Sequence, residues 1–250
     1  MALSRMFQPR TYRTRVNSGR LTAFEVTVKE TDLHVQARRD LSDLTREMIL
    51  EQRGYLEAYI RQYPAFLSTL TPWPLTGPAP NIVLDMVAAG AAAGVGPMAA
   101  VAGAVAEHVG RALIPYSDEV IVENGGDIFL QTTKAATVAV FAGASPLSLR
   151  IGIRTGGQND PLGVCTSAGT VGHSLSFGRA DAVCVVSRSC ALADAAATAI
   201  GNRIQSKQDI PAGIEIGKRI PGVIGLVIVA ADQMGVWGAI EVVALDRKKG

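Results

Sequence analysis

The sequence predicts an α+β fold. Segments with alternating apolar residues and segments with helical spacing come in blocks, without the regular strand-helix alternation of a doubly wound sheet. Apolar residues make up 48% of the 250 residues but aromatic residues only 5%, so Ala, Val, Leu and Ile must fill the core. A chain of this length can bury one large core, and we expect a single domain over residues 1–250.

Alternating apolar residues predict strands early in the chain. The segment "RLTAFEVTVKE" alternates along residues 20–30 and "TDLHVQAR" follows a short turn, so residues 11–37 are expected to contain an antiparallel hairpin. Between residues 43 and 67 the apolar spacing becomes helical, with Asp40 or Ser42 as the N-cap. The four prolines of "TLTPWPLTGPAP" then predict a loop.

Small residues dominate the next two predicted helices, over residues 82–92 and 97–113. Pro97 stands at the first-turn position that proline favours, and the Ala and Gly faces permit close packing. Strands are expected to dominate from residue 119 to 186, most clearly in "TVAVFAG" and "LSLRIG". A helix over residues 191–203 follows, and "GVIGLVIVAAD" and "GAIEVVAL" are expected to form a closing hairpin.

Charge and composition exclude several classes of protein. A net charge of +2 gives no whole-domain attraction to nucleic acid or to an anionic membrane, so neither partner is expected. Residues 86–106 carry no charge and are long enough to span a bilayer. They are mostly Ala and Gly, however, and "GVGP" interrupts them, so two buried helices are expected instead.

The cysteines and the first residues indicate the compartment. Cys165, Cys184 and Cys190 are an odd number without a CxxC spacing, which argues against a disulfide framework. The opening "MALSRMFQPRTYR" is charged and lacks the apolar core of a signal peptide, so a cytoplasmic location is expected. The sequence sets no oligomeric state and leaves a homo-oligomer open.

The stretch "VIVENGGDIFL", residues 120–130, places Gly125 and Gly126 between Asn124 and Asp127. Asn-Gly between alternating apolar residues is a strong signal of a hairpin with a primed turn, and glycine tolerates the positive φ that such a turn needs. The sequence alone leaves open whether this turn also lines a site.

A glycine-rich stretch over residues 163–182, "GVCTSAGTVGHSLSFGRADA", is expected to be a loop. Its hydroxyls, from Thr166, Ser167 and Thr170, and its free backbone N–H groups suit the recognition of phosphate or pyrophosphate. His173 could act as an acid, a base or a hydrogen-bond donor. A polar connection with a structural histidine is the alternative interpretation.

The stretch "ALADAAATAIGNR" places Asp194 and Thr198 four residues apart, on one face of the predicted helix. A carboxylate and a hydroxyl fenced by alanines could hold an oxygen-liking cation such as Mg²⁺ and let phosphate oxygens approach. In the alternative interpretation Asp194 stabilises the start of its own helix and Thr198 bonds back to a carbonyl.

Four stretches carry a resemblance to a known family: "VGPMAAVAGAVAE", "VENGGDI", "CTSAGTVGHSLSFGRADAV" and "LADAAATAIGN". The sequence resembles the uncharacterised protein family 0280, a branch of the ApbE-like superfamily that includes FAD-dependent flavin transferases. This resemblance implies an ApbE-like fold, in which antiparallel strands and packed small-residue helices surround one cleft. The resemblance to family 0280 covers nearly the whole chain, whereas the resemblance to the flavin transferases is confined to these four stretches.

The resemblance also implies roles for individual residues. Asp194 and Thr198 match the transferases' Mg²⁺-binding Asp and Thr beside the FAD pyrophosphate, and Asp194 is with His173 a candidate catalytic residue. The residues that match flavin-binding segments are Glu123, Asn124, Gly125, Gly126, Asp127, Thr166, Ser167, Gly169, Thr170 and His173.

The match departs from the transferases at several positions. Glu123 stands where they have Asn, and Ala168 is an insertion in their Thr-Ser-Gly segment. His173 is not followed by their Asp-Pro, and no Lys-Gly element is found near Pro97. The resemblance therefore implies retention of the ligand site more than retention of the transfer chemistry.

Two kinds of function follow from these residues. The first is a protein that binds FAD, FMN or a related pyrophosphate ligand with Mg²⁺, acting as a transferase or hydrolase on FAD or only binding it. The second, suggested by an association of this branch with sulfide assimilation into homocysteine, is a sulfur-handling accessory protein in which Cys165 reacts. A small buried Cys165 without a reactive role is the alternative.

Overall fold

The computed structural model describes residues 21–169 and 177–245. The described strands are β1 (Thr22–Val28), β2 (Thr31–Ala37), β3 (Val120–Asn124), β4 (Asp127–Thr132), β5 (Ala136–Ala139), β6 (Ile151–Thr155), β7 (Gln158–Ser167), β8 (Ala182–Ser187), β9 (Val223–Ala230), β10 (Gln233–Gly238) and β11 (Glu241–Ala244). The described α-helices are α1 (Ser42–Gln62), α2 (Asn81–Ala93), α3 (Val101–Leu113), α4 (Cys190–Gly201) and α5 (Ile210–Arg219).

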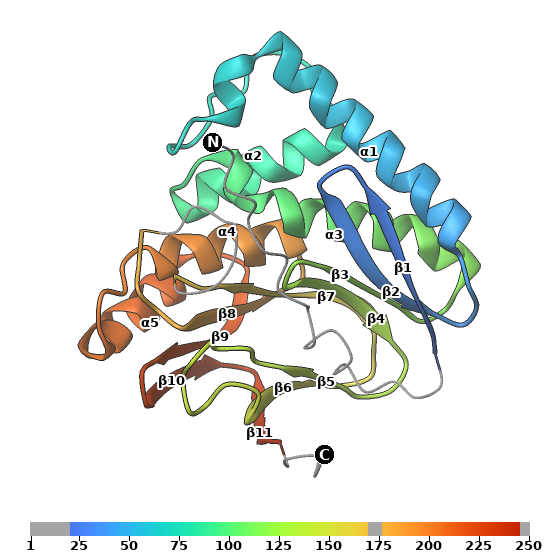
Figure 1. Ribbon diagram of the computed structural model, residues 1–250. Coiled ribbons are helices and arrows are strands. Elements are labelled where there is room, and N and C mark those ends of the chain that lie inside the picture. Colours follow the sequence, from blue (N-terminus) through green and yellow to red (C-terminus); the bar gives the residue numbers. More distant parts are fainter. Residues whose placement is uncertain (1–20, 170–176, 246–250) are drawn as a thin grey trace, which may run out of the picture.

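The described elements form three layers (Figure 1). The middle layer is an eight-stranded sheet in the order β1-β2-β3-β4-β7-β8-β9-β10, and all its neighbouring strands are antiparallel. Helices cover one face of this sheet, and a three-stranded sheet, β11-β6-β5, lies against the other. The α+β class predicted from the sequence is confirmed.

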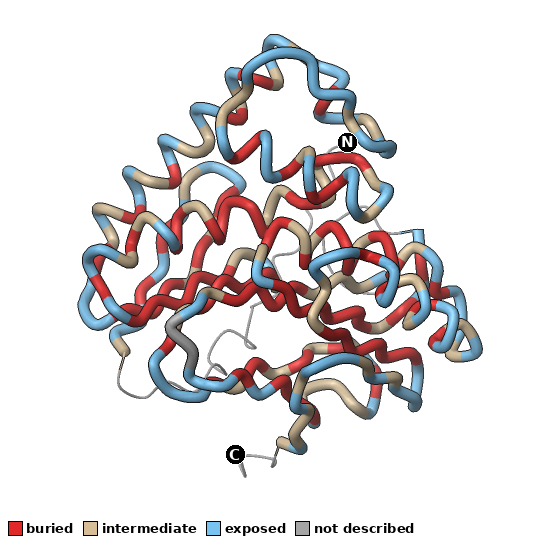
Figure 2. The backbone as a smooth tube through the Cα atoms, turned by 180° about the vertical axis from the view of Figure 1, so that it is seen from behind, coloured by how far each residue is buried: buried red, intermediate tan, exposed pale blue. Residues whose placement is uncertain are grey.

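Side-chain alternation along the central strands separates two hydrophobic cores. On β3, Val122 belongs to the core between the sheet and the helices, whereas Ile121 belongs to the core between the two sheets. On β7, Cys165 belongs to the core on the helix side and Val164 to the core between the two sheets. Figure 2 shows the buried residues concentrated in the large sheet and in the helices that lie on it. Both faces of the central strands are therefore covered.

Glycine allows the helices to lie very close to one another and to the sheet. A Cβ on Gly103 of α3 would lie 2.4 Å from the Cys190 carbonyl oxygen at the start of α4. A Cβ on Gly163 of β7 would lie 2.5 Å from the Cα of Cys190. The start of α4 is thus held between α3 and β7, which no larger side chain at these two positions would permit.

The hairpin predicted at "VENGGDI" is confirmed. Asn124 pairs with Asp127, and Gly125 and Gly126 form the two-residue loop between β3 and β4. Their φ angles are 68° and 121°, so both adopt the positive φ that a primed turn favours. Space does not require glycine at Gly125, because a Cβ there would meet nothing within 4 Å; its φ does.

Most predicted elements are present, with shifted ends. The first hairpin, the two small-residue helices and the helix of Asp194 are confirmed. The helix predicted to reach residue 67 ends at Gln62, because Pro64 disfavours helical backbone before it, and a short 3₁₀ turn follows. Residues 147–150 of "LSLRIG" form a turn before β6.

Two predicted elements are wrong, and the N-cap of α1 is Leu41 rather than Asp40 or Ser42. The closing hairpin does not join "GVIGLVIVAAD" to "GAIEVVAL". A turn at 231–232 reverses the chain, so that β9 pairs with β10, and β11 instead pairs with β6 in the small sheet. The loop expected over residues 163–182 begins only after Ser167, because residues 163–167 pair with β8 and residues 163–165 also pair with β4. Helix α5 was not predicted. A single domain and one cleft stay predictions.

Among the described residues, no single helix is both long and apolar enough to cross a bilayer. The pair of segments Asn81–Ala93 and Pro97–Tyr116 passes only when joined, by length and composition, and the two are bent by 105°. The cytoplasmic location stays a prediction.

Candidate functional site

Asp194 and Thr198 lie on the most enclosed helix of the described structure. Ser189 caps the start of α4 by accepting the Leu192 N–H, and the residues around Asp194 and Thr198 are alanines packed against α2, α3 and the sheet. Between Ala193 and Ile200 only Asp194 and Thr198 are partly exposed. Asp194 and Thr198 therefore lie on one face of α4, as their i, i+4 spacing predicts, and together they form the polar, accessible strip of this segment.

The Asp194 carboxylate caps the start of another helix, α3. Its Oδ2 accepts the Gly103 backbone N–H at 2.9 Å, and α3 begins at Val101, so Gly103 lies in the first turn. No side chain from the N-cap residue, Ala100, performs this role. Asp194 thus supplies from α4 the acceptor that the free N–H groups and the positive end of α3 favour. The alternative interpretation from the sequence has Asp194 stabilise the start of its own helix, α4, whereas the observed contact is with the start of α3.

Helix α3 caps α4 in return. Glu107 Oε2 accepts the Cys190 N–H at 2.7 Å, and Glu107 Oε1 accepts two donors of the Arg111 guanidinium, Nη2 at 2.7 Å and Nε at 3.0 Å. Each helix therefore places a carboxylate at the start of the other. Sequence analysis missed Glu107 and Gly103, because their partners lie more than 80 residues away; the lone glutamate within the apolar segment "VAGAVAE" was the available signal.

The glycine turn of β3 and β4 is tied to the same point of α3. The Asn124 side-chain amide donates to the Ala102 carbonyl oxygen at 3.1 Å. That carbonyl and the N–H that Asp194 accepts belong to a single planar peptide group, Ala102-Gly103. The predicted residues Asn124 and Asp194 are thus fixed at the two ends of one peptide bond.

Asp127, the last residue of the turn segment, is buried on the helix-covered face of the sheet. It pairs with Cys165 across β4 and β7, and its Oδ1 has no hydrogen-bond partner among the described residues. Burial raises the pKa of Asp127 to about 7, the negative charge of Glu123 adds to the rise, and hydrogen bonds from Cys165 and the Thr166 N–H oppose it. Burial and the charge of Asp127 also raise the pKa of Asp194.

The raised pKa of Asp127 makes stability depend on pH. The folded protein keeps a proton on Asp127 that the unfolded chain has already released above pH 4, so the free energy of unfolding falls as the pH rises from about 4 to about 7. In metal-free buffer Asp127→Asn should remove this contribution, which is at most about 4 kcal/mol. Urea unfolding of wild type and Asp127→Asn between pH 4.5 and 7.5 measures it; parallel curves would contradict the assignment.

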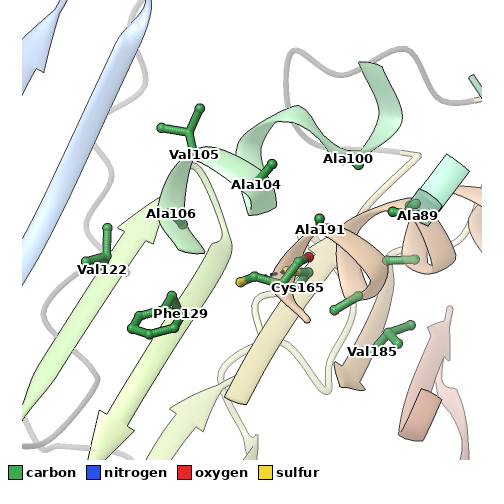
Figure 3. Packing of buried hydrophobic residues seen from close by; sticks show 14 of the residues in the cluster. Ala89, Ala100, Ala104, Val105, Ala106, Val122, Phe129, Cys165, Val185 and Ala191 are labelled. Carbon is green, nitrogen blue, oxygen red and sulfur yellow. Dashed lines mark hydrogen bonds between the residues drawn. The ribbon is translucent and has the colours of Figure 1, made fainter. Parts of the chain in front are cut away.

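The prediction that Cys165 lies in a loop is wrong. Cys165 is fully buried in β7, with its Sγ 3.3 Å from the Cys190 carbonyl oxygen and 3.6 Å from the Cys190 Sγ, and Figure 3 shows it close to Ala191 at the start of α4. Burial raises the pKa of the Cys165 thiol well above its ordinary value. Because the thiolate is the reactive form, this environment favours the structural alternative over sulfur chemistry.

The other predicted ligand-binding residues divide between the two faces of the sheet. Alternation places Ser167 on the face of Cys165, near the end of α4, where a Cβ on Gly201 would lie 3.5 Å from the Ser167 Oγ. Thr166 faces the other way and donates to Cys184 Sγ at 3.3 Å, and Glu123 lies on the same face as Ile121. The side chains of Glu123 and Thr166 therefore do not point toward Asp194, as strand periodicity alone would indicate. Their role in ligand binding stays a prediction.

The remaining predictions concern the end of the glycine-rich stretch. The Gly169 N–H donates to the Ala180 carbonyl oxygen at 2.9 Å, so this backbone donor is used within the protein. His173 and Thr170 lie outside the described residues. Within residues 21–169 and 177–245 there is no group of three or more His, Cys, Asp or Glu side chains that could hold a metal ion.

Comparisons with known proteins place the chain in a family. The family model described as "AbpE bacteria" matches residues 13–215. The UPF0280 protein of Methanococcus aeolicus is 39% identical over 231 residues, covering 90% of this chain and 93% of the relative. The UPF0280 protein of Methanocella arvoryzae is 41% identical over 217 residues, covering 85% and 87%.

Solved structures share the fold at much lower identity. The Pseudomonas stutzeri flavinyl transferase ApbE matches with a TM-score of 0.59 and 14% identity over 90% of this chain and 94% of its own. The Vibrio cholerae flavin transferase ApbE matches with a TM-score of 0.56 and 11% identity over 88% and 97%. The chain therefore belongs to the UPF0280 family of ApbE-like proteins, and it has the fold of the ApbE flavin transferases.

Proposed function

We propose that this protein binds a flavin nucleotide, or a related ligand with a pyrophosphate group, together with Mg²⁺ at the start of α3. The observation that carries the proposal is the meeting of Asp194 with the first turn of α3, through the Gly103 N–H at 2.9 Å. A helix start offers backbone donors and positive potential to phosphate oxygens. An adjacent carboxylate would repel those oxygens unless a cation lay between them.

The residues at this point fit Mg²⁺ by their chemistry. Asp194 offers a carboxylate and Thr198 a hydroxyl on the accessible strip of α4, and both are oxygen donors of the kind that Mg²⁺ prefers. Mg²⁺ is usually held by one or two carboxylates, with waters and substrate phosphates completing its shell.

The protein's own groups have distinct roles in this proposal. Asp194 positions the cation, and the donors at the start of α3 hold phosphate oxygens. The Gly125-Gly126 turn leaves space around Gly125, since a Cβ there would meet nothing within 4 Å. When bound, Mg²⁺ would offset the negative charge that develops on a pyrophosphate during its cleavage. Binding is the core of the proposal; cleavage or transfer of FAD is its extension.

Thermal unfolding tests the proposal directly. With Mg²⁺, FAD or FMN at one hundred times its dissociation constant should stabilise the native state by about 2.7 kcal/mol, which for a chain of this size raises Tm by about 5 to 10 °C. Riboflavin, which has no phosphate, should give a much smaller shift, and EDTA should remove most of the shift by FAD. No shift with saturating FAD and Mg²⁺ would overturn the proposal.

A further inference from the structure

We propose that Asp127 supplies a second carboxylate to the cation site of Asp194. This inference rests on the proposed function and extends it from one acidic ligand to two, contributed by different segments. It assigns the site to a small divalent cation with a preference for oxygen, and in it the glycine turn serves to hold Asp127 against α4.

The burial of Asp127 is the first observation. The residue is only 8% exposed, and its Oδ1 has no hydrogen-bond partner among the described residues. No basic side chain forms an ion pair with it there, whereas the buried Glu107 is paired with Arg111. A buried carboxylate oxygen without a partner is costly, and such groups are normally paired or bound to a metal. A cation would give Asp127 Oδ1 the partner that the described residues do not supply.

The placement of Asp127 is the second observation. It shares the helix-covered face of the sheet with its register partner Cys165. Helix α4 runs along β7, because Cys190 at its start contacts Gly163 and Gly201 at its end lies near Ser167. Asp194, between these two ends, therefore lies over the section of β7 beside which Asp127 is paired.

The third observation is that the two acidic segments share an anchor. Asn124, three residues before Asp127, donates to the carbonyl of the Ala102-Gly103 peptide, and Asp194 accepts the N–H of the same peptide. A planar peptide group fixes the separation of these two anchors. Preorganised ligands of this kind are what a cation site requires, since a loose shell weakens binding.

These observations predict that Asp127 lowers the stability of the cation-free protein and strengthens cation binding. Without a cation the buried Asp127 must either stay protonated or bear an unpaired charge, so it costs stability at neutral pH. With a cation, its Oδ1 gains a partner. If Asp127 instead only holds the turn, by accepting the Thr166 N–H, its loss should lower stability and leave cation affinity unchanged.

Titration of Mn²⁺ alone, without nucleotide, tests the inference by calorimetry on the full chain. Asp127→Asn is expected to weaken Mn²⁺ binding more than tenfold and to raise Tm in EDTA at pH 7.5. Asp160→Asn is the matched control: this exposed aspartate lies on β7 itself, about 20 Å along the strand from Thr166 by the rise per residue. It should leave Mn²⁺ binding unchanged.

The outcomes separate this inference from the proposed function. If Asp194→Asn abolishes Mn²⁺ binding and Asp127→Asn retains it, Asp127 is not a ligand and the cation site of the proposed function stands. If both variants bind Mn²⁺ like wild type, both the inference and the cation site fail. Should Asp127→Asn not fold, Asp127→Ser keeps a hydroxyl for the Thr166 N–H, and wild-type Mn²⁺ affinity in that variant overturns the inference.

Discussion

Asp194→Asn is expected to reduce Mg²⁺-dependent flavin-nucleotide binding by more than tenfold and to leave the metal-free protein at least as stable as wild type at neutral pH. The amide keeps the size of the side chain and an oxygen that can accept the Gly103 N–H. Burial raises the pKa of Asp194, so the metal-free protein favours the neutral carboxyl that Asn resembles. Only the ionised form that a cation needs is lost.

A set of variants separates this role from helix capping. Asp194→Ala also removes the acceptor for α3, and the usual cost of a lost cap, about 1 kcal/mol, should appear with or without metal. Thr198→Val removes one oxygen at nearly constant volume and should weaken binding less than Asp194→Asn. Calorimetric titration of FAD with Mg²⁺ measures all three, with Asp160→Asn as the control. Wild-type affinity in Asp194→Asn would exclude Asp194 as a metal ligand.

Gly103→Ala is expected to destabilise the protein, although alanine is the better helix former. The new Cβ would lie 2.4 Å from the Cys190 carbonyl oxygen and 2.9 Å from the Asp194 Cβ, so α3 and α4 must move apart. Overpacking of this kind costs about 1–3 kcal/mol, more than the gain of about 1 kcal/mol from helix propensity. The same movement should also weaken ligand binding, because Asp194 loses its place at the start of α3.

Gly54→Ala is the matched control for this prediction. Gly54 also lies within a helix, but a Cβ there would meet nothing within 4 Å. That variant should gain up to about 1 kcal/mol and bind ligand like wild type. Urea unfolding and calorimetry of both variants provide the measurements. A Gly103→Ala protein as stable as Gly54→Ala would show that α3 and α4 are not packed as closely as described.

The sequence predicts the parts of this fold that depend on neighbouring residues. The hairpin at Gly125 and Gly126 is local, since its two-residue loop needs positive φ at both positions and glycine supplies it. The shared face of Asp194 and Thr198 follows from helical periodicity alone. Both features therefore appear in the structure where the sequence placed them.

Contacts between distant segments could not be predicted from one sequence. The pairing of β11 with β6 joins two segments far apart in the sequence, and it depends on which sheet β11 enters. Asp194 and Gly103 are 91 residues apart, and their contact depends on how two helices pack. Motif matching also does not show which face of the sheet a residue occupies: Glu123 and Thr166 lie on the face opposite Asp194, and their role in ligand binding stays a prediction.

A crystal soaked with FAD and MnCl₂ tests the central claim, that a cation and a pyrophosphate are held where α3 begins. The account predicts pyrophosphate density at the Ala102-Gly103 peptide and an anomalous manganese peak within coordination distance, about 2.2 Å, of an Asp194 carboxylate oxygen. Flavin density elsewhere on the protein, or manganese without contact to Asp194 in a crystal that holds FAD, would contradict it.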